Sequence, residues 1–315
     1  MRYDLVTLGE VLLRLAVPSP GRFETAHRLD VQFGGAEANV AAACARLGLR
    51  TAWLSALPDN AWGERVLREL RAHGIDCSHV TSLRGARLGL YFLEYGVHPR
   101  AIHVLYDRSD SAFARLTPDK INWDPVRHAK LVHVSGVTPA LGENSRALVR
   151  RLFDEAHEIS FDLNYRAALW SPAEARDFAV SILPRVRYFF LGRAEAHTVL
   201  GMTGSPQTIL KELAELAPNA TIAVLNGAEG STVFDRGEIW EPRIRHNVNV
   251  VDPIGAGDAY AAGYLWASLR GRGTQEAVDI AATVAALKCS TWGDIALIDE
   301  RDVSDALRGG PDVRR

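Results

Sequence analysis

The stretch Asp252-Pro253-Ile254-Gly255-Ala256-Gly257-Asp258 is the most informative one in this chain of 315 residues. It follows a β-rich run at 248–251, which predicts a strand, and it leads into small residues up to Leu269, which predict a helix. At such a junction, glycines let backbone N–H groups approach an anion, and the helix N-terminus adds partial positive charge. The stretch matches neither the G-x-G-x-x-G pattern nor the lysine-bearing P-loop pattern. It therefore predicts a phosphate cradle without a lysine of its own.

Asp258 adds an acid to the first turn of the predicted helix. The helix dipole favours its ionised form, so we expect its pKa to be depressed. Phosphoryl transfer has a loose transition state, and a weak base in the right place suffices for it. On these residues alone a simple helix start after a glycine turn is an equally good interpretation.

The rest of the chain predicts an α/β fold. Apolar runs that read as strands alternate with segments of helical spacing, which indicates a parallel sheet covered on both faces, with ligands outside the carboxyl ends of its strands. Predicted strands are 5–8, 51–57, 131–134, 159–163, 188–191 and 222–225, and predicted helices are 36–47, 62–72, 144–156, 172–183, 195–200, 257–269 and 274–290.

Two segments do not follow the alternation, at about 12–35 and 88–113. The first reads as a small antiparallel excursion. The second contains two strands of a hairpin, 88–95 and 101–106, with a turn at 96–100. Because no linker separates these segments from the rest, we interpret residues 1–315 as a single domain that carries a small β lid.

Composition excludes several classes of protein. The chain is 47% hydrophobic and 23% charged, with a net charge of −2, so we expect neither a nucleic acid nor a membrane surface as a partner. Its three cysteines are far apart, which argues against disulfides and zinc and favours a cytoplasmic location. No apolar run approaches the roughly 18 residues that a membrane helix needs.

Two motifs together resemble a known family. The D-x-x-G-A-G-D stretch followed by Ala-Tyr-Ala-Ala-Gly at 259–263 resembles the C-terminal signature of ribokinase/PfkB carbohydrate kinases, and residues 34–41 running into Leu47-Gly48 resemble the N-terminal one. The resemblance covers nearly the whole chain. It implies a ribokinase-like, three-layer α/β domain with a β-sheet lid that phosphorylates a carbohydrate with ATP and Mg²⁺. It also implies a homodimer or higher oligomer formed through the lid, Asp258 as the catalytic base, and an anion hole made of Gly255, Ala256 and Gly257.

Further stretches resemble the 2-keto-3-deoxygluconate kinases of that family. They are 34–37, Tyr91, 106–112, 135–141, 162–166, 169–172 and Asp252-Pro253. A sugar acid carries a carboxylate, which a planar guanidinium recognises well, and Arg108 and Arg166 stand where both can reach one cleft. The resemblance implies a substrate site of these two arginines with Gly34, Gly35, Asn39, Tyr91, Tyr106 and Asp258. For the two tyrosines, packing within the lid is an equally good interpretation.

The nucleotide side resembles the family less closely. Residues 226–230 resemble its nucleotide loop, so the implied ATP contacts are Asn164, Gly192, Asn226, Gly227, Gly230, Gly255 and Gly257. Glu195 matches the family's magnesium-linked glutamate, but Gly192 replaces the usual asparagine. We expect Glu195 and Asp252 to meet the metal indirectly. Ala281 and Ala282 stand where relatives often have an asparagine near adenine.

The expected reaction converts 2-keto-3-deoxygluconate and ATP to the 6-phosphate and ADP. One alternative is the same chemistry on fructose, ribose or a nucleoside. Another is a non-catalytic protein that senses sugars on the same fold. An NAD-dependent oxidoreductase is disfavoured, because no G-x-G-x-x-G follows the first strand.

Overall fold

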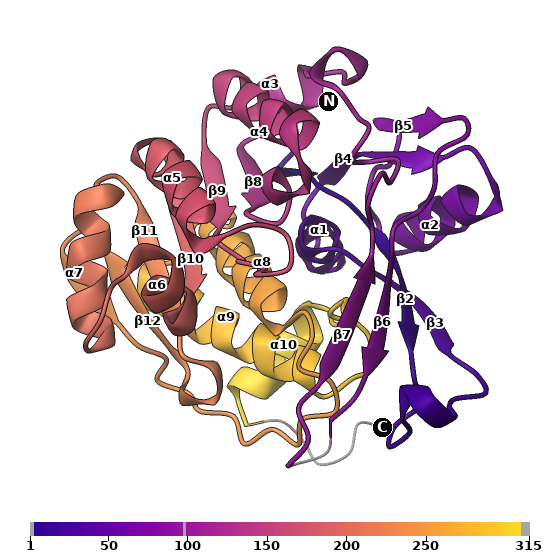
Figure 1. Ribbon diagram of the computed structural model, residues 1–315. Coiled ribbons are helices and arrows are strands. Elements are labelled where there is room, and N and C mark those ends of the chain that lie inside the picture. Colours follow the sequence, from indigo (N-terminus) through magenta and orange to yellow (C-terminus); the bar gives the residue numbers. More distant parts are fainter. Residues whose placement is uncertain (1–2, 97–98, 310–315) are drawn as a thin grey trace.

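The computed structural model describes residues 3–96 and 99–309 (Figure 1). A nine-stranded sheet has the order β13-β12-β11-β10-β9-β8-β1-β4-β5, parallel from β11 to β5 and antiparallel at β12 and β13. Strands β1, β4, β8 and β9 are buried along their whole length, which explains their uninterrupted apolar runs. The strands are β1 (Leu5–Leu8), β4 (Thr51–Pro58), β5 (Val80–Leu83), β8 (Leu131–Ser135), β9 (Ile159–Asp162), β10 (Tyr188–Gly192), β11 (Thr221–Leu225), β12 (Ser231–Asp235) and β13 (Glu238–Trp240).

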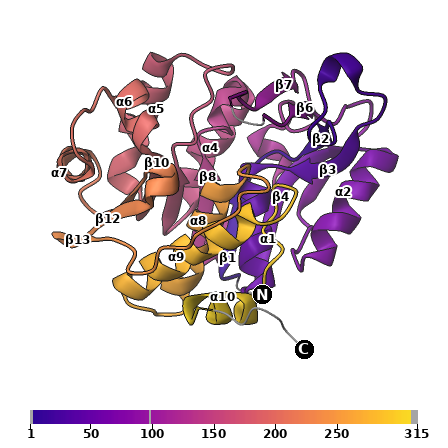
Figure 2. The ribbon, with the colours of Figure 1, turned by 90° about the horizontal axis from the view of Figure 1, so that it is seen from below.

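Helices cover both faces of this sheet (Figure 2). On one face the core includes Leu148, Phe161 and Leu213, and on the other Phe190 and Leu265. The first layer contains α3 (Asp124–Arg127), α4 (Glu143–Glu155), α5 (Pro172–Ile182), α6 (Arg193–Leu200) and α7 (Pro206–Leu216). The second contains α1 (Ala36–Arg46), α8 (Ala256–Leu269), α9 (Thr274–Cys289) and α10 (Glu300–Leu307), and α2 (Ala61–Ala72) packs against β4. The predicted three-layer α/β fold is confirmed.

A separate four-stranded sheet forms the lid (Figure 1). Its order is β3-β2-β6-β7, with β2 parallel to β6 and the other pairs antiparallel. The strands are β2 (Leu12–Ala16), β3 (Asp30–Gly34), β6 (Leu90–Glu94) and β7 (His103–Asp107), all within the two predicted lid segments. Residues 97 and 98 of the predicted hairpin turn lie outside the described residues.

The strand predicted at 248–251 is wrong. This segment has no strand partner, and it approaches the glycine stretch as irregular backbone. The amides of Val251 and Asp252 donate instead to the carbonyl of Cys289, at the end of α9. The glycine stretch is therefore anchored to the C-terminus of a helix and not to the sheet.

Candidate active site

The parallel strands place several loops at one edge of the sheet. Glu10 lies just after β1, and Asn164 follows β9. The N-terminus of α1 is fastened to the same edge by Glu37, which is buried and accepts hydrogen bonds from the Ser135 amide and hydroxyl (both 2.8 Å) and from the Thr138 hydroxyl (2.7 Å). The N-terminal motif is thereby held at the edge where Asn39 contacts Asp258 of the C-terminal motif, more than two hundred residues away in the sequence.

The glycine stretch opens α8 with the backbone shape that a cradle needs. Gly255 is the N-cap residue and lies in the left-handed region at φ 83°. A Cβ on this residue would collide with the carbonyl oxygen of Asp294, so both conformation and space call for glycine. Gly257 has no atom within 4 Å of the position that a Cβ would occupy. That open space, at a helix N-terminus, suits an anionic group.

Asp258 is enclosed by side chains from distant parts of the sequence. Asn39 Nδ2 on α1 donates to its Oδ2 at 2.7 Å, and Asn164 Nδ2 donates to its Oδ1 at 3.4 Å. Asn164 has a left-handed φ of 39°, a conformation that asparagine tolerates better than most residues. The structure therefore brings two of the predicted site residues, Asn39 and Asn164, to the carboxylate of a third, Asp258.

The expectation of a depressed pKa for Asp258 is wrong. Burial raises its pKa to about 7, although the Asn39 hydrogen bond and the nearby charge of Arg166 act in the opposite direction. The charges of Asp294 and Glu37 add to the increase. The helix dipole does not compensate for loss of water, so Asp258 resembles a base poised near neutral pH.

Arg166 and the lid tyrosines form one wall of the same site. Burial alone would lower the pKa of Arg166, but Tyr106, Asp258 and Glu195 outweigh it and hold that pKa above its usual value. Tyr106, on β7, lies 6.0 Å from Tyr91, on β6, measured between ring centroids. Residues of the lid and of the β9 loop are thus joined beside Asp258.

Arg108 also belongs to this wall, but it has a partner that the sequence did not reveal. Its guanidinium lies 5.5 Å from the Tyr106 ring centroid, and it pairs with Glu10, with Nη2 and Nε at 2.5 and 2.9 Å from Oε2. Both side chains are buried. Glu10 therefore balances part of the charge that we expected Arg108 to offer to a ligand.

Comparison with known proteins identifies the family. The profile of the pfkB family of carbohydrate kinases matches residues 3–301. The chain belongs to this family. It is 39% identical to 2-dehydro-3-deoxygalactonokinase of Haloferax volcanii over 98% of both chains, and 32% identical to 2-dehydro-3-deoxygluconokinase of Thermoproteus tenax over 97% and 94% of the two chains. The crystal structure of 2-dehydro-3-deoxygluconokinase from Thermotoga maritima is similar with a TM-score of 0.91 and 30% identity, over 97% and 99% of the two chains.

The chain is accordingly a carbohydrate kinase of the pfkB family, and this family uses ATP with Mg²⁺. The predicted nucleotide loop lies between β11 and β12. Gly227 and Gly230 have φ values of 59° and 100°, with open space at the position of a Cβ. Asn226 Oδ1 is buried and has no hydrogen-bond partner. An orphaned acceptor beside two open glycines is a feature that a nucleotide's donor groups can satisfy.

Two further acidic side chains, Glu195 and Asp162, interact electrostatically with each other, and Asp162 also with Asp258. Glu195 accepts hydrogen bonds from the Gly192 and Tyr165 amides, both at 2.7 Å, so it fastens the ends of β10 and β9 together. Burial, with the charges of Glu195 and Asp258, holds the pKa of Asp162 well above its ordinary value. Within the described residues no group of three or more ligands is ready to enclose a metal. The indirect contact of Glu195 with Mg²⁺ stays a prediction.

Asp252 lies in a different environment from Glu195. Its side chain has no exposed surface, and its carboxylate contacts Arg14, Tyr95 and the Gly293 amide. Its indirect metal contact stays a prediction, with no exposed carboxylate to support it.

Sequence reasoning missed Glu10, Glu37, Arg14 and Asp294 as members of this region. A Cβ on Gly34 would collide with the Asp294 carboxylate, and the Tyr91 hydroxyl donates to the same group at 2.8 Å. Glu37 stands inside the stretch 34–37, which resembles the 2-keto-3-deoxygluconate kinases, so a signal for it existed. Asp294 stands in no motif, and only the tertiary structure reveals it.

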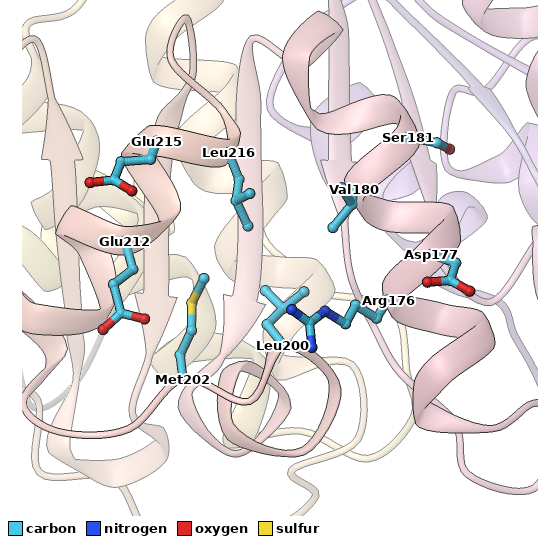
Figure 3. Close-up of a pocket in the computed structure, with 9 residues that line it drawn as sticks. All are labelled: Arg176, Asp177, Val180, Ser181, Leu200, Met202, Glu212, Glu215 and Leu216. Atoms are coloured by element: carbon cyan, nitrogen blue, oxygen red, sulfur yellow. The ribbon is translucent and has the colours of Figure 1, made fainter.

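A groove outside this site lies between α5 and α7 and has a volume of about 530 Å³ (Figure 3). Arg176, Val180, Met202 and Glu212 are among the residues that line it, and none of the predicted site residues does.

Among the described helices, none combines the length and the apolar character that crossing a bilayer requires.

Proposed function

We propose that this kinase phosphorylates the terminal hydroxyl of a 2-keto-3-deoxy sugar acid, with 2-keto-3-deoxygluconate or its C4 epimer, the galactonate, as acceptor. The convergence of Arg166 and Arg108 on Tyr106, next to Asp258, is the observation that carries this proposal. A carboxylate on the acceptor would match the charge of Arg166 and the part of the Arg108 charge that Glu10 does not balance. We include the galactonate as a candidate acceptor because the relative from Haloferax volcanii is a 2-dehydro-3-deoxygalactonokinase.

In the proposed reaction Asp258 accepts the proton of the attacking hydroxyl. The backbone amides of Gly255, Ala256 and Gly257 hold the oxygens of the transferring phosphoryl group, where negative charge is concentrated. Mg²⁺ would neutralise charge on the phosphates of ATP. Residues assigned to the nucleotide are Asn164, Gly192, Asn226, Gly227 and Gly230, with Glu195 toward the metal.

The acceptor would lie between the lid and the N-terminus of α1. Gly34 and Gly35 shape this part of the site, because a side chain on either would collide with the Asp294 carboxylate or with the Glu10 backbone. The Asn39 amide, which already donates to Asp258, would also form a hydrogen bond with a hydroxyl of the sugar. The lid tyrosines would exclude water, which limits ATP hydrolysis.

The raised pKa of Asp258 predicts a pH profile. The base must be ionised to accept a proton, so kcat/KM for the acceptor should rise with pH up to about 7 and level off above it. Initial rates at saturating ATP between pH 5 and 9 measure this limb. A limb centred near pH 4 would mean that burial does not control the carboxylate in the working enzyme.

An acceptor panel tests the proposal directly. The full-length chain is assayed for ADP release with both keto-deoxy sugar acids, with fructose and ribose, and with a nucleoside. We expect the highest kcat/KM for a sugar acid. The ratio of kcat/KM for the gluconate to kcat/KM for the galactonate shows which of the two epimers is the preferred acceptor. A preference for a neutral sugar would reject the carboxylate role, and no transfer to any acceptor would favour the sugar-sensing alternative.

The lid dimer and the single-domain organisation both stay predictions. Strand β7 forms one edge of the lid sheet and exposes 57% of the Leu105 side chain, which favours pairing with another lid.

A further inference from the structure

Two of the largest side chains without exposed surface are cationic: Arg14, on lid strand β2, and Lys288, on α9. Removing a cation from water is costly, so each needs close anionic or hydrogen-bonding partners. Both find one in Asp252. Arg14 Nη2 lies 2.5 Å from Asp252 Oδ2, and Lys288 Nζ donates to the Asp252 carbonyl at 2.8 Å. The reaction proposed above uses neither of these cations.

Arg14 also connects Asp252 to other elements. Its Nη1 pairs with the carboxylate of Asp294, and its Nη2 bonds the hydroxyl of Tyr95. Tyr95 follows lid strand β6, and its hydroxyl donates to Asp252 Oδ2 at 2.7 Å. One guanidinium on the lid thus bridges two buried carboxylates of the body of the protein.

Those carboxylates belong to residues that border the anion-hole loop on both sides. Asp252 Oδ1 accepts from the amide of Ile254 at 3.0 Å, which shapes the start of the loop. The carbonyl of Asp294 lies against Gly255, where it leaves no room for a Cβ. A shift of either residue would therefore displace the amides that follow Ile254.

We propose that Arg14 is a positioning residue for phosphoryl transfer: from the lid it fixes Asp252 and Asp294, and through them the amides of residues 255–257. This inference rests on the proposed role of that loop. Arg14 has no exposed surface with which to touch a substrate, so it acts on the geometry of the loop. Misplacement of catalytic groups by about 1 Å can cost roughly 10²-fold in rate.

The test compares Arg14→Ala and Arg14→Lys in the full-length chain. In Arg14→Ala we expect kcat to fall about 10- to 100-fold, while KM for ATP and for the acceptor changes less than about threefold. Arg14→Lys should recover only part of kcat, since an ammonium lacks the fork that bridges two carboxylates. Millimolar guanidinium should raise kcat of Arg14→Ala and leave the wild type unchanged.

Arg14→Ala leaves two buried carboxylates without their guanidinium partner, which destabilises the fold, so a second variant controls for misfolding. The double variant Arg14→Met/Asp252→Asn removes one charge of each sign and should fold. Circular dichroism and ATP binding verify the fold. We expect kcat to fall as much as in Arg14→Ala. Arg100→Ala is the matched control on the lid. Arg100 is partly exposed and pairs with Glu94 at 3.2 Å, so its removal should leave kcat unchanged.

Wild-type kcat in a folded Arg14→Ala or double variant would overturn the inference. So would a loss confined to KM, because that would place Arg14 in substrate binding. The wild type is first assayed on the acceptor panel, and its best acceptor is used for every variant. A neutral sugar as best acceptor would reject the sugar-acid assignment, and the Arg14 comparison would still be decided with that sugar.

Discussion

Asp258→Asn is expected to lower kcat by at least about 10²-fold, the usual scale for a group that transfers a proton. Asparagine keeps the size of the side chain and can still accept a hydrogen bond from Asn39, so binding of ATP and of the acceptor should persist. The measurement is steady-state kcat with the best acceptor, together with the Kd of ATP. A fall of less than tenfold would remove Asp258 from the role of base.

The same variant should not lose stability. Burial disfavours the ionised carboxylate, which is why the pKa of Asp258 is raised to about 7, and a neutral amide avoids that cost above this pH. We expect Tm at pH 8 to equal or exceed that of the wild type. Stability gained as activity is lost is the usual trade-off at an active site, and it separates a chemical defect from misfolding.

Arg166→Ala is expected to raise KM for a sugar acid by about 10- to 100-fold, which corresponds to loss of a charged hydrogen bond of about 1.5–3 kcal/mol. Loss of the cation also raises the pKa of Asp258, because the charge of Arg166 favours its ionised form. Kinetics at pH 9, where Asp258 is ionised, separate the two effects. Unchanged KM for the sugar acid at that pH would refute the carboxylate role.

Arg193→Ala supplies the matched control for this prediction. Arg193 is the first residue of α6 and donates to the carbonyl of Gly204, in the exposed loop that follows this helix. Its removal should therefore leave KM for the sugar acid unchanged. Arg108 needs a different design, because Arg108→Ala alone would strand the buried carboxylate of Glu10. Arg108→Ala/Glu10→Gln removes both charges, and we expect an increase in KM similar to that of Arg166→Ala.

The motifs predicted which residues would meet, because strand-helix alternation puts the carboxyl ends of parallel strands at one edge. Of the three residues that meet, Asn164 follows parallel strand β9 as that rule requires, whereas Asn39 and Asp258 stand near the starts of α1 and α8. The rule does not indicate how deeply a group is buried, so the sign of the Asp258 pKa shift was missed. The same rule does not identify Asp294. This residue contacts Gly34 and Gly255 because the loop after α9 passes beside them, and no local pattern indicates that course.

Residue propensity was misleading at 248–251, and the helical pattern of α7 was overlooked. Residues 248–251 have β-forming side chains, but their backbone bonds to the end of α9, a tertiary contact that propensity does not report. Helix α7 had a visible start signal in Ser205-Pro206, and its apolar positions Ile209, Leu210 and Leu213 follow helical spacing. That helix was predictable, unlike the partners of Arg14.

The bridge from Arg14 to Asp294 also has a consequence for the order of synthesis. The guanidinium of Arg14 leaves the ribosome well before its two carboxylate partners, which stand at 252 and 294. A nascent chain that ends before residue 294 carries the lid with this cation incompletely paired. Completion of the lid junction therefore awaits synthesis of Asp294, and a truncation that removes the loop after α9 takes this partner away and leaves Arg14 its pair with Asp252.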